Sequence, residues 1–122
     1  MRTILVAATL LAALAGTALA DSYPVSGRFG ESATAEKDPI DCTDKRVIAF
    51  NGDQRTDSKG GVPAYRNRTV TPDGEQRFRV VDVFTSGQIR DAQSIYTLTL
   101  VDANRIEMRL DQGSTIMLQR CK

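Results

Sequence analysis

The sequence contains no histidine and no tryptophan among its 122 residues, and only two cysteines. Without histidine, neither a Ser-His-Asp nor a Cys-His catalytic arrangement can form, and the commonest metal ligand is missing. We therefore expect a protein that is not an enzyme, with no catalytic residues, no cofactor and no metal. Carboxylate pairs are the alternative general acid and base, either Asp38 with Asp41 or Asp53 with Asp57, although both pairs have the setting of ordinary loop residues.

The chain has almost no excess charge of either sign, with 16 Lys and Arg against 15 Asp and Glu. Nucleic acids and anionic membranes attract proteins that carry a clustered positive excess. We therefore predict that neither is the main partner. After the first apolar stretch, no run approaches the roughly 20 residues that a membrane-spanning helix requires, so no membrane span is expected.

The first residues have the pattern of a secretion signal. Arg2 supplies the positive start, Ile4 to Leu14 the apolar stretch, and Ala18-Leu19-Ala20 a small-x-small cleavage site. Removing these 20 residues from 122 leaves 102, enough for one domain with one modest core. The short, alanine-rich signal is typical of bacteria and predicts a periplasmic or secreted protein, with a eukaryotic secretory route as the alternative.

Cys42 and Cys121 are expected to form a disulfide in that oxidising compartment. Closing so long a loop is worth about 4 kcal/mol in the chain-entropy model. Cys42 precedes the apolar run Val47 to Phe50, and Cys121 follows the last predicted strand, so the bond would join the two ends of a sheet as a barrel requires. A redox or metal-binding pair is the alternative, but it lacks the CxxC spacing.

The stretch from Ser94 to Arg120 predicts three antiparallel strands. Asp102-Ala103-Asn104 and Asp111-Gln112-Gly113 each suit a three-residue loop whose last residue accepts the left-handed conformation. These loops set Leu98 opposite Met108, and the apolar residues then share one face: Tyr96, Leu98, Leu100, Ile106, Met108, Leu110, Ile116 and Leu118. The other face, predicted to be wet, carries Thr97, Thr99, Arg105, Glu107, Arg109, Thr115 and Gln119.

Earlier segments predict further strands. Val25 to Gly30 suits a short first strand, and Val47 to Phe50 a second that ends at a turn signal. Asp53 to Pro63 is expected to be a long mobile loop, which leaves room for a brief returning strand within it. Ala64 to Thr71 and Gln76 to Phe84 should then pair around a three-residue loop.

In that pairing Pro72-Asp73-Gly74 is the loop, and Thr85-Ser86-Gly87 forms the next one, which sets Asp82 opposite Arg90 and Val83 opposite Ile89. Even-numbered positions then face inward, which suits Phe78, Val80 and Phe84. The same rule also places four charged residues inside, namely Arg66, Arg68, Asp82 and Arg90. Unpaired buried charge is costly, so this placement needs an explanation.

Two explanations remain open. A bulge near Val80-Val81 would turn Asp82 and Arg90 outward and leave Arg66 and Arg68 at the barrel mouth with their guanidinium groups in solvent. Alternatively, Arg66, Arg68 and Arg90 line an opening and bind a small anion or carboxylate through forked hydrogen bonds.

The opening of the predicted mature chain carries a family resemblance. Val25-Ser26-Gly27-Arg28-Phe29 resembles the first strand of the calycin barrels, most of all the small periplasmic inhibitors of bacterial metalloproteases, which often begin Gly-Arg-Trp. Cys42 with Cys121 is similar to the disulfide that joins the C-terminal end of some lipocalins to an early strand. This chain has Phe29 where tryptophan is usual, and the inhibitors place their cysteines closer together. The resemblance implies an arm that enters a partner, here Asp21, Ser22, Tyr23 and Pro24.

Together these features predict an all-β protein, a small antiparallel meander barrel of seven or eight strands with one disulfide. Residues 1–20 are the signal, 21–41 an N-terminal arm that includes the predicted first strand, and 42–122 the barrel core. The leading hypothesis is a non-enzymatic, inhibitor-like extracytoplasmic binding module that engages another protein through its arm and loops, including Asn51 to Pro63. The alternatives are a carrier or sensor of a small anionic ligand at the barrel mouth and a small hydrolase that uses carboxylates.

Overall fold

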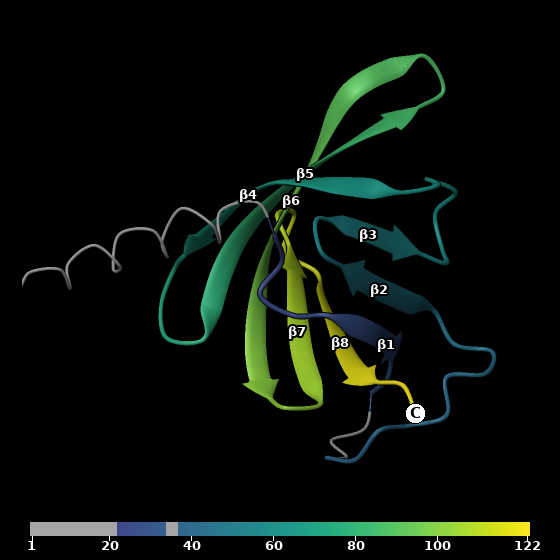
Figure 1. Ribbon diagram of the computed structural model, residues 1–122, viewed down its shortest axis with the longest axis vertical. Helices are drawn as coiled ribbons and strands as arrows, with labels where there is room; N and C mark the ends of the chain where they lie inside the picture. Colours follow the sequence, from purple (N-terminus) through teal and green to yellow (C-terminus); the bar gives the residue numbers. More distant parts are fainter. Residues whose placement is uncertain (1–21, 34–36) are drawn as a thin grey trace, which may run out of the picture.

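The computed structural model describes residues 22–33 and 37–122, and in this part the chain is a closed barrel of antiparallel strands (Figure 1). The predicted signal peptide and Asp21 lie outside the described residues. Within the described part, no helix is long and apolar enough to cross a membrane. The strands are β1 (Gly27–Glu31), β2 (Val47–Asn51), β3 (Gln54–Asp57), β4 (Tyr65–Pro72), β5 (Arg77–Ser86), β6 (Ile89–Asp102), β7 (Arg105–Leu110) and β8 (Thr115–Arg120).

Each strand pairs with the next, and β1 closes the ring by pairing with both β2 and β8. Phe29 lies opposite Ile48 on one side and opposite Arg120 on the other. The narrowest seam joins β3 to β4 through two residue pairs, Gln54 with Arg66 and Arg55 with Tyr65. The predicted all-β barrel is therefore confirmed, and β3 is the brief returning strand within the predicted loop Asp53 to Pro63.

The two C-terminal hairpins have the predicted pairing. Leu98 lies opposite Met108, and Met108 lies opposite Ile116, with all three side chains buried. The turn between β6 and β7 differs from the prediction in one detail. Asn104 does not adopt the left-handed conformation, and its backbone N–H donates to the Asp102 carboxylate at 2.9 Å. Strict alternation and short loops were enough to define this part of the sheet.

The predicted pairing of β4 with β5 and of β5 with β6 is wrong by four positions. Val70 lies opposite Val80, and Asp82 lies opposite Ser94 rather than Arg90. The β4–β5 turn is longer than predicted, because β4 extends through Pro72 and Gln76 adopts a positive φ of 57°. A shift of four is even, so the even-numbered residues of β5 still face inward.

The predicted bulge near Val80-Val81 is also wrong. The pairing changes phase within β4, between Asn67 and Thr69, and leaves the alternation of β5 intact. Asp82 therefore stays inside the barrel. The bulge turns Asn67 inward and places Arg66 and Arg68 on the exposed surface.

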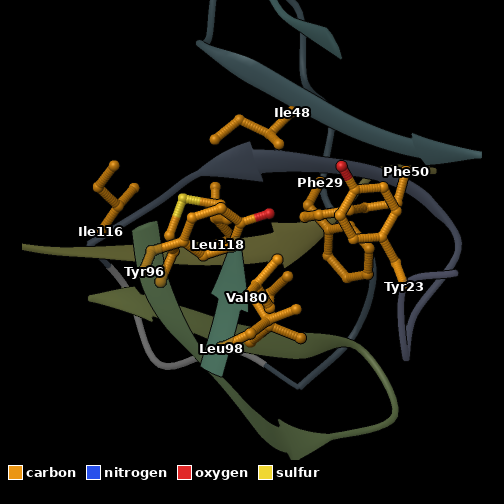
Figure 2. Close-up of a cluster of buried hydrophobic side chains, with 11 residues drawn as sticks. Tyr23, Phe29, Ile48, Phe50, Val80, Tyr96, Leu98, Ile116 and Leu118 are labelled. Carbon is orange, nitrogen blue, oxygen red and sulfur yellow. The ribbon is translucent and has the colours of Figure 1, made fainter. Parts of the chain in front are cut away.

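Apolar side chains fill the interior of the barrel (Figure 2). Aromatic rings from the first two strands meet edge to face, with the ring centroids of Phe29 and Phe50 6.2 Å apart. The buried cluster comprises Tyr23, Phe29, Ile48, Phe50, Val80, Tyr96, Leu98, Ile106, Met108, Ile116 and Leu118. Side chains alone can fill a barrel of about eight strands, and here they do.

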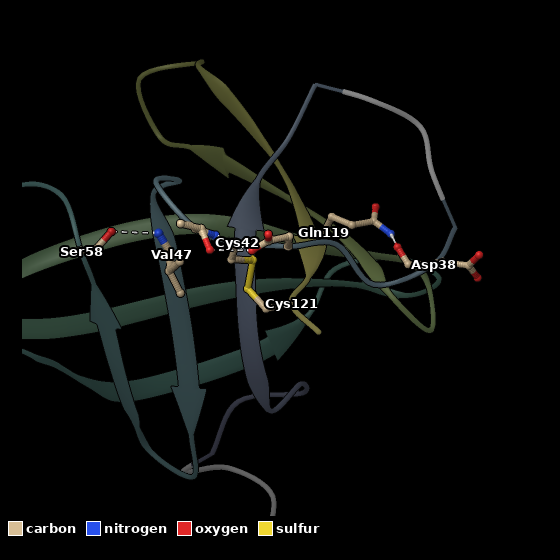
Figure 3. Close-up of a disulfide and its surroundings, with 8 residues drawn as sticks. Asp38, Cys42, Val47, Ser58, Gln119 and Cys121 are labelled. Carbon is tan, nitrogen blue, oxygen red and sulfur yellow. Dashed lines mark hydrogen bonds between the residues drawn. A yellow bond between two sulfur atoms is a disulfide. The ribbon is translucent and has the colours of Figure 1, made fainter.

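The segment before β2 covers the outer face of β8, and the disulfide holds it there (Figure 3). Cys42 and Cys121 form the predicted bond across a sequence separation of 79 residues, and Ile40 bridges to Cys121. Gln119 donates to the Asp38 carbonyl oxygen at 2.7 Å and is 1% exposed. Gln119 faces outward as predicted, but it is not exposed to solvent, because the segment before β2 lies over it.

Gly30 in β1 lies directly under the disulfide. A Cβ atom at this position would be 2.6 Å from the Cys42 sulfur, closer than real Cβ contacts allow. The disulfide can therefore cross the outer face of the sheet at this point only because residue 30 has no side chain.

We expect Gly30→Ala to destabilise the protein by about 1–3 kcal/mol when the disulfide is present, through overpacking against the Cys42 sulfur. In a Cys42→Ala/Cys121→Ala background the same substitution should cost much less, because the crowding atom is gone. Urea unfolding of the four proteins measures this coupling. An equal cost in both backgrounds would contradict the assigned contact.

Candidate functional site

A buried ion pair crosses the barrel interior between β3 and β5. Arg55 Nε lies 2.8 Å from Asp82 Oδ2, and the two side chains are 4% and 0% exposed. Strand alternation positions both, because Arg55 lies opposite Phe50 of β2, and Asp82 is two residues after Val80. A lone charge at either position would be very unfavourable, so each residue permits the burial of the other.

Asp82 accepts hydrogen bonds from three strands. Besides Arg55, the Tyr96 hydroxyl of β6 donates to Oδ2 at 2.8 Å, and Asn67 Nδ2 of β4 donates to Oδ1 at 3.3 Å. Burial raises the pKa of Tyr96 well above its ordinary value, an effect that Arg55 opposes and Asp82 reinforces. The Tyr96 hydroxyl therefore remains a donor across the ordinary pH range.

Two tyrosine rings hold the Arg55 guanidinium in place. Its central carbon lies 3.8 Å from the centroid of the Tyr65 ring and 4.9 Å from that of Tyr96. Tyr65 in turn meets the ring of Phe84 at a centroid distance of 5.0 Å. Burial lowers the pKa of Arg55, but the oxygens of Tyr96 and Asp82 outweigh burial and the net direction is upward, so the group is a permanent cation.

Tyr23 approaches the same ion pair from the N-terminal arm. Its ring meets Phe50 edge to face at 5.0 Å, and its backbone N–H donates to the Gly52 carbonyl oxygen at 3.1 Å. The hydroxyl is buried near Asp82 and Arg55, yet it forms no hydrogen bond of acceptable geometry with the described residues. Burial, reinforced by Asp82, raises its pKa far above the ordinary value.

A cleft of about 390 Å³ opens beside Arg55, between the β3–β4 seam and the β7–β8 turn. A second ion pair lies at its edge, where Arg46 Nε and a terminal nitrogen contact the two Asp57 oxygens at 3.0 and 2.7 Å. Burial raises the pKa of Asp57, but hydrogen bonds from Arg46 and the Lys59 N–H outweigh it, so the pKa is lowered overall. Tyr65 and Phe84 form an aromatic wall of the cleft.

This arrangement presents fixed donors rather than a reactive base. Asp82 is inaccessible and engaged by three donors, and the acidic side chain of Asp57 is held by Arg46. Within residues 22–33 and 37–122, no group of three or more metal-ligating side chains converges. The groups that this site presents are guanidinium N–H donors beside aromatic rings.

The far ends of β5 and β6 form a ribbon that pairs with no other described strand. β4 pairs with β5 only as far as Val83, and β7 pairs with β6 only from Tyr96, so among the described strands residues 84–92 pair only with one another. This ribbon is the green hairpin that projects beyond the barrel in Figure 1. Ile89 beside its tip is 64% exposed.

The structure does not bring the three predicted ligand-binding arginines together inside the barrel. Even numbering placed Arg66, Arg68 and Arg90 on the inward face, but all three are exposed. The β4 bulge turns out the first two, and a second irregularity beside Arg90, where Asp91 has a φ of 55°, displaces the third. Arg66 and Arg68 instead line an outer depression that also contains Asp53 and Asp91. Anion binding there stays a prediction.

Part of the predicted partner-binding arm packs against the barrel. Asp21 lies outside the described residues, Ser22 and Pro24 are half-buried, and Tyr23 is 8% exposed. Partner binding by the arm stays a prediction, but Tyr23 would have to leave the barrel end to contribute its ring.

Sequence reasoning missed Arg55, which lies in the stretch Asp53 to Pro63 that was predicted to be a mobile loop. A short polar strand such as Gln54–Asp57 has no apolar alternation that would identify its inward positions. The available signal was Asp82, whose even number placed it inside the barrel. A buried carboxylate requires a buried cation, and that requirement could have prompted a search for Arg55.

We expect Asp82→Asn to destabilise the protein by about 3 kcal/mol or more, because it leaves the Arg55 charge buried without a counter-ion. Tyr96→Phe removes one hydrogen bond and should cost about 1 kcal/mol. The double variant Arg55→Met/Asp82→Leu should be more stable than Asp82→Asn. Urea unfolding measures all three, and a double variant less stable than the single one would refute this assignment.

The Arg46–Asp57 pair should make stability depend on pH. The folded state lowers the Asp57 pKa, so the pair's contribution is present above the unfolded value of about 3.9 and is lost as pH falls through the folded value. Asp57→Asn should cost about 1 kcal/mol at pH 7 and progressively less below about pH 4. Asp73→Asn, at an exposed pair, is the matched control. A stability difference between Asp57→Asn and the unmodified protein that does not change with pH would contradict the assignment of this contribution to the ion pair.

Comparisons of the chain with protein-family models, with curated proteins and with solved structures found no match. The resemblance to calycin barrels therefore remains a prediction that depends on residues 25–29 and the general layout.

Proposed function

We propose that this protein is a non-enzymatic extracytoplasmic binding module that engages another protein through the end of the barrel that carries the ribbon. The observation that supports this most is the ribbon itself, residues 84–92, whose strands pair only with each other among the described strands. An isolated two-stranded ribbon is marginally stable in water. A chain that maintains one beyond its core is expected to use it.

The ribbon has the chemistry of a protein-binding element. Its outer edges leave backbone N–H and C=O groups available to an added strand, and proteins usually guard such edges. Ile89 adds an exposed apolar side chain near the tip, while Phe84 anchors the base through its contact with Tyr65. Because Phe84 fixes the base of the ribbon to the barrel, the tip can extend beyond the barrel and stay exposed.

The filled interior supports the same proposal. Buried side chains occupy the barrel, so a deep ligand chamber would require the core to be rearranged. We therefore assign the main contact to the ribbon rather than to the arm, because the Tyr23 side chain already packs within the barrel. The inhibitor-like action that the calycin resemblance implies remains part of this proposal.

The proposed location agrees with the covalent structure. The Cys42–Cys121 disulfide is compatible with an oxidising extracytoplasmic compartment, where such bonds form and persist. The signal-like residues 1–20 point to the same compartment.

A photo-crosslinking side chain at Gln88 should yield a discrete adduct with a partner protein in the compartment to which the chain is exported. Ile89→Asp should reduce that adduct about tenfold, because it places a charge at the proposed apolar contact. The same crosslinker at Met117, which is 37% exposed on β8, is the matched control. Equal adducts from both positions, or an adduct insensitive to Ile89→Asp, would refute the ribbon as the binding element.

A further inference from the structure

We propose that the cleft beside Arg55 binds a monocarboxylate that carries an apolar group. The cleft lies at the base of the ribbon and is lined by Phe84, but not by Gln88 or Ile89 at the tip. Ligand binding to the cleft is measured on the protein alone, so its result does not depend on the protein partner proposed for the ribbon.

Arg55 is a preorganised carboxylate-binding group. A guanidinium has five N–H donors, and the recorded hydrogen bond to Asp82 uses only the one on Nε. Arg55 lines the cleft, and neither of its terminal nitrogens is among the sealed, unpartnered atoms of the described chain. The side chain is only 4% exposed, and we infer that its terminal nitrogens reach the cleft between the rings of Tyr65 and Tyr96.

Arg46 adds donors at the edge of the same cleft. Its Nε and one terminal nitrogen bond Asp57, which leaves the other terminal nitrogen available. The two neighbouring carboxylates are already engaged, since the Asp57 and Asp82 side chains are 5% and 0% exposed. A ligand in the cleft consequently meets N–H donors that favour a planar, two-oxygen acceptor.

The apolar walls of the cleft and its charge balance further limit the class of ligand that it can bind. Tyr65, Phe84, Ile95 and Leu110 supply apolar surface around the donors, and about 390 Å³ falls within the usual range for small-ligand sites. Each arginine is paired with its own aspartate, so the cleft has no surplus positive charge to neutralise a dianion such as a phosphate monoester. A single carboxylate joined to an apolar or aromatic group depends less on surplus charge, because the arginine N–H donors and the apolar walls hold it instead.

Asp111 lies at the rim of the cleft and provides an internal test. Its charge is exposed and opposes an incoming anion, although solvent screens that repulsion. Asp111→Asn should therefore tighten carboxylate binding about twofold to threefold. Asp73→Asn is the matched control, because Asp73 is exposed and does not line this cleft.

The experiment is a titration of isotope-labelled protein with 3-phenylpropionate, followed by backbone amide chemical shifts. At concentrations up to about 10 mM, we expect saturable shifts around Arg55, Phe84 and Leu110, since small ligands of this size bind with a Kd on the order of 1 mM. The uncharged 3-phenylpropionamide should bind about tenfold more weakly, because it loses the charge-assisted fork. This comparison uses the unmodified protein, so it does not depend on a variant that fails to fold.

A second arm distinguishes a free acid from a peptide C-terminus as the source of the carboxylate. Acetyl-Ala-Phe with a free carboxylate should bind more tightly than 3-phenylpropionate if the cleft takes a chain end, and more weakly if it takes a free acid. Equal binding of the acid and its amide, shifts centred on Arg66 and Arg68, or the absence of saturable shifts would each overturn the proposal.

Discussion

The end of the barrel that carries the cleft depends on one interaction, the ion pair between Arg55 and Asp82. Asp82 joins four strands, because donors from β3, β4 and β6 converge on a carboxylate of β5. The β4 bulge at Arg68 follows from the same requirement, since it turns Asn67 inward to donate to Asp82. Tyr65 and Tyr96 then fix the guanidinium that the pair has brought into the barrel.

How far the sequence predicts this fold depends on how local each signal is. The pairing of Leu98 with Met108 followed from alternation and short loops, which are properties of neighbouring residues. The β4–β5 register was missed because Pro72 ends a strand instead of starting the turn, and several loop lengths suit the residues after it. Because the register error was an even number of residues, it did not change which face of β5 is buried. The buried residues of β5 were therefore predicted correctly although their partners were not.

The candidate site was harder to predict because its key contact joins residues far apart in the sequence. Arg55 and Asp82 are 27 positions apart, and neither has neighbours that indicate its partner. The inward placement of Asp82 was the correct signal, but a bulge in β5 offered a simpler explanation than a second buried charge. The exposed positions of Arg66 and Arg68 depend on the bulge at Arg68, which no local pattern in β4 indicates.

Because side chains fill the barrel interior, the two sites that we propose lie at its surface and ends. The core leaves no deep chamber, and the disulfide holds residues 37–42 over the outer face of β8. These sites are the ribbon, whose outer edges pair with no other described strand, and the cleft at its base, which Arg55 lines. Magnetic-resonance observation of the Arg55 Nε proton tests this account most directly. A slowly exchanging proton with contacts to the Tyr65 and Tyr96 rings is the predicted result, and a proton that exchanges rapidly with water and lacks those contacts would contradict it.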